Sequence, residues 1–386
     1  MPDTARRGGF GLYIHWPFCA AKCPYCDFNS HVSASIDMAR WQEAYLAELD
    51  RYGEETSENL LNSVYFGGGT PSLMAPEIVD AILEKVSNHW RLANDLEVTL
   101  EANPSSVEAG RFQSYREAGV NRVSLGVQAL NDTDLRKLGR LHDLSQALQA
   151  IDIASNTFDR MSFDLIYARQ DQGFEDWQSE LTRALSFAPD HLSLYQLTIE
   201  DGTAFGDRFK RGKLAGLPDE DLAADMYFLT QELCESAGLP AYEVSNHAKP
   251  GQESRHNLIY WRGGDYVGIG PGAHGRLSKS GRRFATWTEL APATWLGAVE
   301  NGKSGEAGRE MLSAKDHAGE YLMMSLRMSE GTDLTRFAQL AGGEIAPKTL
   351  SSLEELGLIR VEADQLTATP QGRAVLNAII TELLPD

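Results

Sequence analysis

The sequence predicts an α/β fold, a partial (β/α)6 TIM-like barrel followed by a β-rich extension and a small C-terminal helical domain like a winged helix. Strand-like runs alternate with amphipathic helical patterns over the first two-thirds of the 386-residue chain. After about residue 240 the pattern changes to short strand-like runs and glycine-rich turns. A composition break at residues 301–308 then has the character of a linker. We therefore expect domains at residues 9–240, 241–300 and 309–386.

The barrel units are predicted from six strand-like runs, each ending in a polar or glycine-rich loop. In chain order the runs are GLYIHW, SVYFGG, LEVTLEA, RVSLGVQ, MSFDLIY and HLSLYQLTI. Helical patterns lie between them, for example over residues 38–53, 76–90 and 173–188. Parallel strands connected by helices place their carboxyl ends together, where the chemistry of such barrels gathers.

Residues that could bind a ligand follow these strands. Three cysteines follow the first strand, GGGTP follows the second and EANP the third, Gln128 ends the fourth, and Asp164 lies in the fifth. Glycine in GGGTP allows close backbone approach to a ligand, because it has no Cβ and tolerates positive φ. GGGTP is not a nucleotide P-loop, since no Gly-Lys-Ser/Thr follows it. Its alternative interpretation is a tight strand-to-helix turn.

The last third of the chain predicts the extension and the C-terminal domain. AYEVSNHA, HNLIYW and DYVGIGPGAHG have the character of short strands. Beyond the linker, AGEYLMMSLRM predicts a helix, and GLIRVEADQLTATPQGRAVLNAIITELL predicts a helix end, a β-hairpin and a helix. Residues 305–386 carry 7 Lys+Arg and 13 Asp+Glu. This acidic balance favours a packing or lid role over contact with nucleic acid phosphates.

The composition limits the possible partners. The formal net charge of −20 disfavours unspecific binding to nucleic acid or anionic membranes. No apolar run reaches about 18 residues, so we expect no transmembrane helix. The first residues contain no apolar signal-peptide core, and a cytoplasmic location is expected. In a reducing compartment, clustered cysteines are metal ligands or catalytic groups more often than disulfides.

Three of the four cysteines, Cys19, Cys23 and Cys26, form the pattern C-x3-C-x2-C. A structural zinc site needs four ligands, and a thioredoxin-like pair would leave Cys19 idle. A [4Fe–4S] cluster usually takes four cysteines, so three would leave one iron open for an exchangeable ligand. We favour the cluster; buried structural cysteines or a redox pair are the alternatives. Cys234 lies in an amphipathic helix pattern and is interpreted as a buried structural residue.

C-x3-C-x2-C after the first strand, with Tyr25 just before the last cysteine, resembles the radical S-adenosylmethionine (SAM) superfamily. The resemblance implies that the three thiolates hold a [4Fe–4S] cluster and that its open iron chelates the amino and carboxylate groups of SAM. In that superfamily, one electron from the cluster cleaves SAM to methionine and a 5′-deoxyadenosyl radical.

The motifs YIHWPFC, YFGGGTPS, EANP, SLGVQ, FDLIY and GIGPGAHG resemble the oxygen-independent coproporphyrinogen III oxidase-like family over nearly the whole chain. The resemblance implies SAM contacts at Tyr13, Tyr25, Gly68, Gly69, Thr70, Glu101, Gln128, Arg140 and Asp164. A carboxylate can pair with the SAM ammonium or its ribose hydroxyls, and an arginine can offer a fork to its carboxylate. The alternative for each residue is a structural hydrogen bond at a strand end.

Two functions compete within this family. The oxidase branch has a long N-terminal extension and a further cysteine two positions after the last cluster cysteine, whereas here 12 residues precede Tyr13 and that position is Phe28. CPYCDF and HNLIYW resemble the haem-chaperone (HemW-type) branch and its H-N-x-x-Y-W signature. This resemblance implies haem as ligand, His256 as a haem ligand and an unidentified haem-acceptor protein; a homodimer is possible. Coproporphyrinogen oxidation is the second candidate, and whether SAM is cleaved stays open.

The alternative for His256 is a hydrogen-bonded core histidine. Read as a strand, HNLIYW would place His256, Leu258 and Tyr260 on one face. Other histidines could serve as the haem ligand instead. These are His15, His31, His142, His247 and His274.

Overall fold

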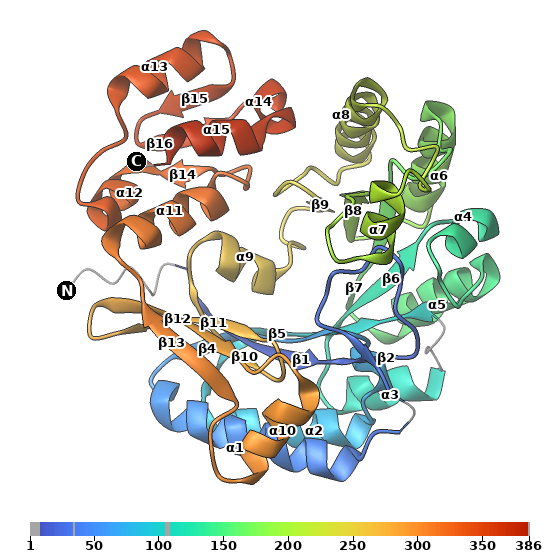
Figure 1. Ribbon diagram of the computed structural model, residues 1–386, viewed down its shortest axis with the longest axis vertical. Helices are drawn as coiled ribbons and strands as arrows, with labels where there is room; N and C mark the ends of the chain where they lie inside the picture. The colour runs from blue at the N-terminus through green and yellow to red at the C-terminus, as the bar shows by residue number, and fades with distance from the viewer. Residues whose placement is uncertain (1–7, 34, 105–108, 385–386) are drawn as a thin grey trace.

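A computed structural model describes residues 8–33, 35–104 and 109–384. Its main feature is an 11-stranded sheet in the order β13-β12-β11-β10-β1-β4-β5-β6-β7-β8-β9 (Figure 1). Six consecutive parallel strands form its centre, and they confirm the six predicted strands. They are β1 (Phe10–Trp16), β4 (Leu60–Gly68), β5 (Arg91–Ala102), β6 (Arg122–Gln128), β7 (Arg160–Tyr167) and β8 (His191–Gln196).

The barrel is open, as predicted. β9 (Asn246–Ala248) pairs antiparallel with β8 at one side of the six strands, and β10 (Asp265–Ile269) pairs parallel with β1 at the other. An antiparallel extension continues from β10 to the far edge of the sheet. It consists of β11 (His274–Lys279), β12 (Arg282–Thr288) and β13 (Glu306–Met311).

Helices cover the outer face of the sheet. The strands they cover are almost continuously buried, as expected for parallel strands with both faces packed. Trp16 of β1 contacts Trp41 and Tyr45, and Trp41 stacks on Trp295 with ring centroids 5.5 Å apart. The helices of this region are α1 (Met38–Thr56), α2 (Pro76–His89), α3 (Ala109–Glu117), α4 (Asp132–Lys137), α5 (Leu144–Thr157), α6 (Phe174–Ser186), α7 (Ala204–Lys210), α8 (Glu220–Ser236) and α10 (Pro292–Glu300).

Local sequence signals set where several helices begin. Asp143 and Gln146 form a capping box at the start of α5. The side chain of Asp219 accepts a hydrogen bond from the backbone N–H of Leu222 at the start of α8. Within α8, Cys234 is fully buried, as predicted, and burial raises the pKa of its thiol to about 12.

The HNLIYW segment is a helix, α9 (Arg255–Trp261), and not the predicted strand. The backbone N–H groups of Arg255 and His256 donate to the buried carboxylate of Glu97, at 3.2 and 3.1 Å. The Ser254 hydroxyl accepts from the backbone N–H of Asn257. These acceptors satisfy the free N–H groups of the first helical turn. The helix was hard to foresee from the sequence because Glu97 is distant along the chain. Figure 1 shows α9 between the sheet and the C-terminal domain.

The predicted linker at residues 301–308 is only partly a loop. Only its first part is a turn, because β13 starts at Glu306 and pairs with β12. Arg309 then makes an ion pair with Glu55 of α1 and another with Glu306. The sheet therefore continues to Met311, beyond the break in composition.

The C-terminal domain has its own apolar core, and the predicted hairpin between helices is confirmed. Its three-stranded sheet has the order β14-β16-β15. Among the residues that the structure describes, no helix is long and apolar enough to cross a membrane. The domain comprises α11 (Ala314–Ser325), β14 (Thr332–Asp333), α12 (Leu334–Ala341), α13 (Pro347–Glu355), β15 (Ile359–Glu362), β16 (Gln365–Ala368), α14 (Pro370–Ala374) and α15 (Leu376–Leu383).

Candidate cluster and ligand-binding site

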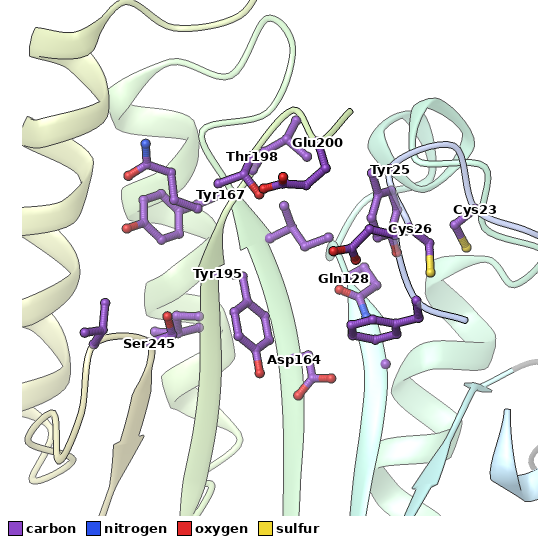
Figure 2. Close-up of a pocket in the computed structure, with 18 of the residues that line it drawn as sticks. Cys23, Tyr25, Cys26, Gln128, Asp164, Tyr167, Tyr195, Thr198, Glu200 and Ser245 are labelled. Atoms are coloured by element: carbon purple, nitrogen blue, oxygen red, sulfur yellow. The ribbon is translucent and has the colours of Figure 1, made fainter. Parts of the chain in front are cut away.

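A cavity of about 1100 Å³ lies at the carboxyl ends of the central strands. Its walls come from the cysteine loop, from strands β4 to β8, from α8 and from the C-terminal domain. Figure 2 shows Cys23 and Cys26 on one side, Tyr195 and Ser245 on the other, and Asp164 between them. Eleven of the predicted site residues line it: Cys19, Cys23, Tyr25, Cys26, Gly68, Gly69, Thr70, Glu101, Gln128, Arg140 and Asp164.

The three loop cysteines are half-buried and free of disulfides. Cys19 ends the short strand β2 (Phe18–Cys19), which pairs with β3 (His31–Val32), and the Cys26 N–H donates to the Cys23 carbonyl at 3.2 Å. Burial raises the pKa of the Cys19 and Cys26 thiols. Hydrogen bonds offset part of this cost, since the Thr70 hydroxyl lies 3.4 Å from the Cys19 sulfur.

The donor set fits an iron–sulfur cluster better than a single metal ion. Among the described residues, no three His, Cys, Asp or Glu side chains converge closely enough to hold one ion. In a polynuclear cluster each thiolate binds a different iron, so three thiols spread along one loop suit it. Structural zinc would need four tetrahedral ligands, and the loop provides three.

Arg140 ties the cysteine loop to the neighbouring strands. Its guanidinium donates to the Cys23 sulfur and to the Tyr25 hydroxyl, both at 3.3 Å, and to the Gly126 carbonyl at 2.9 Å. It also donates to the side-chain oxygen of Asn103. Arg140 therefore joins the cysteine loop to the end of β6 and to the EANP motif.

Asn103 is a site residue that the sequence analysis missed. Its side chain contacts Arg140 and donates to the Thr70 hydroxyl at 2.9 Å, which joins the GGGTP turn to the cysteine loop. It lies within the EANP motif, so its place two positions after Glu101 was the available signal.

The GGGTP turn needs glycine. Gly68 has φ +110°, and a Cβ there would lie 2.6 Å from the His15 ring. A Cβ on Gly69 would lie 2.6 Å from the Phe18 carbonyl oxygen. The Gly69 N–H donates to the carbonyl of Trp16 at the end of β1, and the Thr70 N–H donates to the carbonyl of Phe18. The turn is therefore fixed against the cysteine loop, with backbone exposed to the cavity.

Two buried carboxyl groups face the cavity. Glu101 accepts hydrogen bonds from the Tyr65 hydroxyl at 2.8 Å and from the Gly68 N–H at 3.2 Å. Asp164 accepts from the Ser124 hydroxyl at 3.4 Å. Burial raises the pKa of Glu101 to about 7 and that of Asp164 to about 6. Neither carboxyl group forms an ion pair within 4 Å with a described residue. A cationic ligand beside them would therefore stabilise their ionised forms.

These pKa values predict a pH-dependent effect of Glu101→Gln. Between the ordinary pKa of 4.5 and the raised value of about 7, the folded protein holds a proton that the unfolded chain has lost. The free energy of unfolding of the ligand-free protein therefore falls as pH rises through this window. The difference in unfolding free energy between Glu101→Gln and the parent protein should shift by about 3 kcal/mol in favour of the variant from pH 4 to pH 8. Denaturant unfolding at both pH values measures it, and a constant difference would contradict the raised pKa.

Gln128 holds an unusual backbone conformation at the end of β6. Its φ is +73°, in the left-handed region that non-glycine residues rarely adopt. The register between β6 and β7 shifts between Leu125 and Gln128. Such a conformation costs about 1 kcal/mol or more, and here it directs the Gln128 side chain to the cavity (Figure 2).

Tyr13 and His256 are not among the residues that line the cavity. The Tyr13 hydroxyl lies 3.1 Å from His15 Nδ1. His256 is 1% exposed; its Nδ1 lies 2.7 Å from the Ser63 hydroxyl and its Nε2 2.5 Å from the Tyr260 hydroxyl. Burial lowers the pKa of His256 to about 3. Both ring nitrogens are engaged, so the hydrogen-bonded core alternative matches this geometry, and a haem-ligand role would require both contacts to break.

The far walls of the cavity were not predicted as site residues. Tyr195 of β8 and Ser245 face the cysteine loop across the cavity (Figure 2). Tyr227 of α8 adds a second aromatic side chain, and the C-terminal domain adds Arg327 and Arg373. No local motif marks these residues; only the packing of distant segments brings them together.

The comparisons with known proteins agree with this site. Residues 13–181 match the radical SAM superfamily model, and residues 312–375 match the HemN C-terminal domain. Escherichia coli heme chaperone HemW is 36% identical over 97% of this chain and 98% of its own length. The Mycobacterium tuberculosis heme chaperone HemW is 37% identical over 100% of this chain and 97% of its own length. Bos taurus radical S-adenosyl methionine domain-containing protein 1, mitochondrial, is 38% identical over 97% of this chain and 87% of its own length.

A solved structure supports the fold. The radical SAM enzyme coproporphyrinogen III oxidase (HemN) from Escherichia coli overlays with a TM-score of 0.82, covering 99% of this chain and 92% of its own, at 20% identity. At that identity the likeness concerns the fold alone. The full-length relatives, in contrast, align from the cysteine loop through the C-terminal domain. The chain therefore belongs to the HemW family within the radical SAM superfamily.

Proposed function

We propose that this protein is a haem chaperone, which binds haem in the described cavity and passes it to an acceptor protein. The carrying observation is the cavity itself, which joins a cysteine loop to an arginine-bearing wall in one space of about 1100 Å³. Pockets for one small ligand usually span about 300–1000 Å³. At about 1100 Å³ this cavity lies just above that range, and we infer that it takes a tetrapyrrole beside a second ligand.

That second ligand is SAM, held next to a [4Fe–4S] cluster on Cys19, Cys23 and Cys26. When bound, the cluster supplies one-electron chemistry. The chain's own residues hold and orient SAM. The GGGTP turn offers backbone groups, and Glu101 and Asp164 offer carboxylates to the cationic part of SAM. Arg140 fixes the loop through Cys23 and Tyr25.

The remaining parts of the proposal concern partners and place. The haem acceptor is a protein of unidentified sequence, and the chaperone acts in the cytoplasm, alone or as a homodimer. The net charge of −20 makes nucleic acid an unsuitable partner.

Oxidation of coproporphyrinogen is the second candidate, favoured by the fold shared with the oxidase from Escherichia coli. We place it second because Phe28 stands where the oxidase branch carries a further cysteine. The Phe28 side chain is 59% exposed beside the cysteine loop. This chain therefore lacks the further cysteine of the oxidase branch, at a position where the side chain is accessible.

One anaerobic assay separates the two candidates. The reconstituted protein receives coproporphyrinogen, SAM and a reductant, and decarboxylated product is measured by chromatography; in parallel, haem-loaded protein is mixed with a haem-free acceptor such as apo-myoglobin as a probe. We expect haem transfer and no decarboxylation above a cluster-free control. Turnover of coproporphyrinogen would reverse the order of the two functions.

We also predict that His256→Ala lowers stability and leaves haem coordination unchanged. The change leaves the Ser63 and Tyr260 hydroxyls without a partner in a buried space, which should lower the free energy of unfolding by about 2–4 kcal/mol. Denaturant unfolding and the Soret spectrum at saturating haem measure the two effects. His89→Ala, in α2 and not among the residues that line the cavity, is the control for loss of a histidine. A shifted Soret band in folded His256→Ala protein would restore His256 as haem ligand.

A further inference from the structure

The C-terminal wall of the cavity differs in charge from the other walls. It is formed by Arg327, just after α11, and by residues 373–378 of α14 and α15. In the part of the chain that the structure describes, this wall contributes two arginines and no carboxylate. Carboxylates belong to the other walls, at Glu200, Asp219 and Glu220 among others. The cavity is therefore polarised, with its positive side on the C-terminal domain.

Neither arginine forms an ion pair with a residue that the structure describes. Arg327 donates to the Asn377 side-chain oxygen at 3.2 Å, and Arg373 lies beside the Tyr227 phenol with its Nη1 buried and without a hydrogen-bond partner. Among the described residues, no carboxylate lies within 4 Å of either guanidinium, whereas Arg360 in the same domain pairs with Glu362. Buried charges in proteins are usually paired, so two half-buried, unpaired arginines on one cavity wall point to an anionic ligand.

The nearest buried acid is already engaged elsewhere. Glu243 lies close enough to raise the pKa of Arg327, although burial of Arg327 lowers that pKa more. The Glu243 carboxylate accepts from the Asn246 side chain and from the Ser245 N–H. These hydrogen bonds engage the Glu243 carboxylate within its own loop, and it forms no ion pair within 4 Å with either arginine.

Apolar side chains close in sequence to Arg373 also line the cavity. Val375, 44% exposed, and Leu376 lie on the same wall, and Val244 lies next to Ser245. A ligand bound here would meet cations at one edge and apolar surface along its face. That combination suits a flat, apolar molecule with carboxylates on a single edge.

We propose that Arg327 and Arg373 bind the two propionates of haem, which places the propionate edge on the C-terminal domain and the opposite edge toward the cysteine loop. This inference rests on the proposed haem-binding function and deepens it. Arginine binds carboxylates through two parallel N–H···O bonds, so two guanidiniums match two propionates. The site then selects a dicarboxylate tetrapyrrole over its neutral ester.

The test compares haem with its dimethyl ester, which keeps the iron and the macrocycle and removes both negative charges. Absorption titrations in one solvent mixture use the parent protein, the double variant Arg327→Gln/Arg373→Gln, and Arg360→Gln as a surface control on the same domain. We expect the parent protein and the control to bind haem at least about tenfold more tightly than the diester. The double variant should bind haem and the diester with similar affinity, because losing the arginines weakens only the binding of haem, whose propionates are free.

The outcomes separate this inference from the proposed function. Equal binding of haem and diester by the parent protein would overturn the propionate site and leave haem binding intact; that result needs no variant, so misfolding cannot obscure it. An undiminished preference in a folded double variant would also overturn the assignment. Binding of neither tetrapyrrole by the parent protein would overturn both the inference and the proposed haem function.

Discussion

Replacement of Cys19, Cys23 or Cys26 by alanine, one at a time, should abolish cluster assembly. Iron in the anaerobically reconstituted protein should fall from about four atoms per chain to background, with loss of the visible charge-transfer absorption. Each thiol lines the cavity, and no other cysteine does, since Cys234 is buried in α8. A cluster already short of one protein ligand is not expected to survive on two.

Cys234→Ala is the matched control for these variants. It removes the same atoms from a fully buried position outside the cavity, so stability should fall by about 1–2 kcal/mol while the iron content stays at the parent level. Retention of full iron by any of the three loop variants would remove that cysteine from the ligand set.

Gly68→Ala should remove both stability and SAM binding. The residue has φ +110°, and the new Cβ would lie 2.6 Å from the His15 ring in a packed region. Strain and steric overlap together should lower the free energy of unfolding by about 2–4 kcal/mol. Because the Gly68 N–H donates to Glu101, displacement of the turn also shifts one of the two carboxylates proposed to bind the SAM cation. SAM affinity by calorimetry and denaturant unfolding measure the two effects.

Gly297→Ala, the same type of substitution, is expected to raise the stability of the protein instead of lowering it. Gly297 lies within α10, where a Cβ meets nothing within 4 Å. Alanine is the better helix former, so this variant should gain about 0.5–1 kcal/mol and bind SAM like the parent protein. A Gly68→Ala protein as stable as the parent, with unchanged SAM affinity, would contradict the role given to the turn.

The central strands were predictable because each depends on its own residues. A buried parallel strand is a short apolar run that ends in a polar or glycine-rich loop, and all six such runs became β1 and β4–β8. The same local logic located the cysteines, the GGGTP turn and the carboxyl groups at strand ends. Eleven predicted residues line the cavity because the carboxyl ends of parallel strands meet there.

The errors arose where distant residues decide the conformation. HNLIYW has a strand-like composition, yet Glu97 of β5 binds the first N–H groups of α9 and makes it a helix. The edge strand β13 is polar because its exposed side needs no apolar residues. Its start at Glu306 therefore has the composition of a linker. The arginine wall needs the C-terminal domain to pack opposite the strand ends, and no motif records that packing.

The most direct test of the proposed function is an anaerobic titration of haem into the reconstituted protein, followed at the Soret band with and without SAM. We predict a saturable spectral change with one haem per chain, both without SAM and at saturating SAM, because the cavity of about 1100 Å³ has room for both ligands. A titration that never saturates, or haem binding abolished by SAM, would contradict the proposal that both ligands share this cavity.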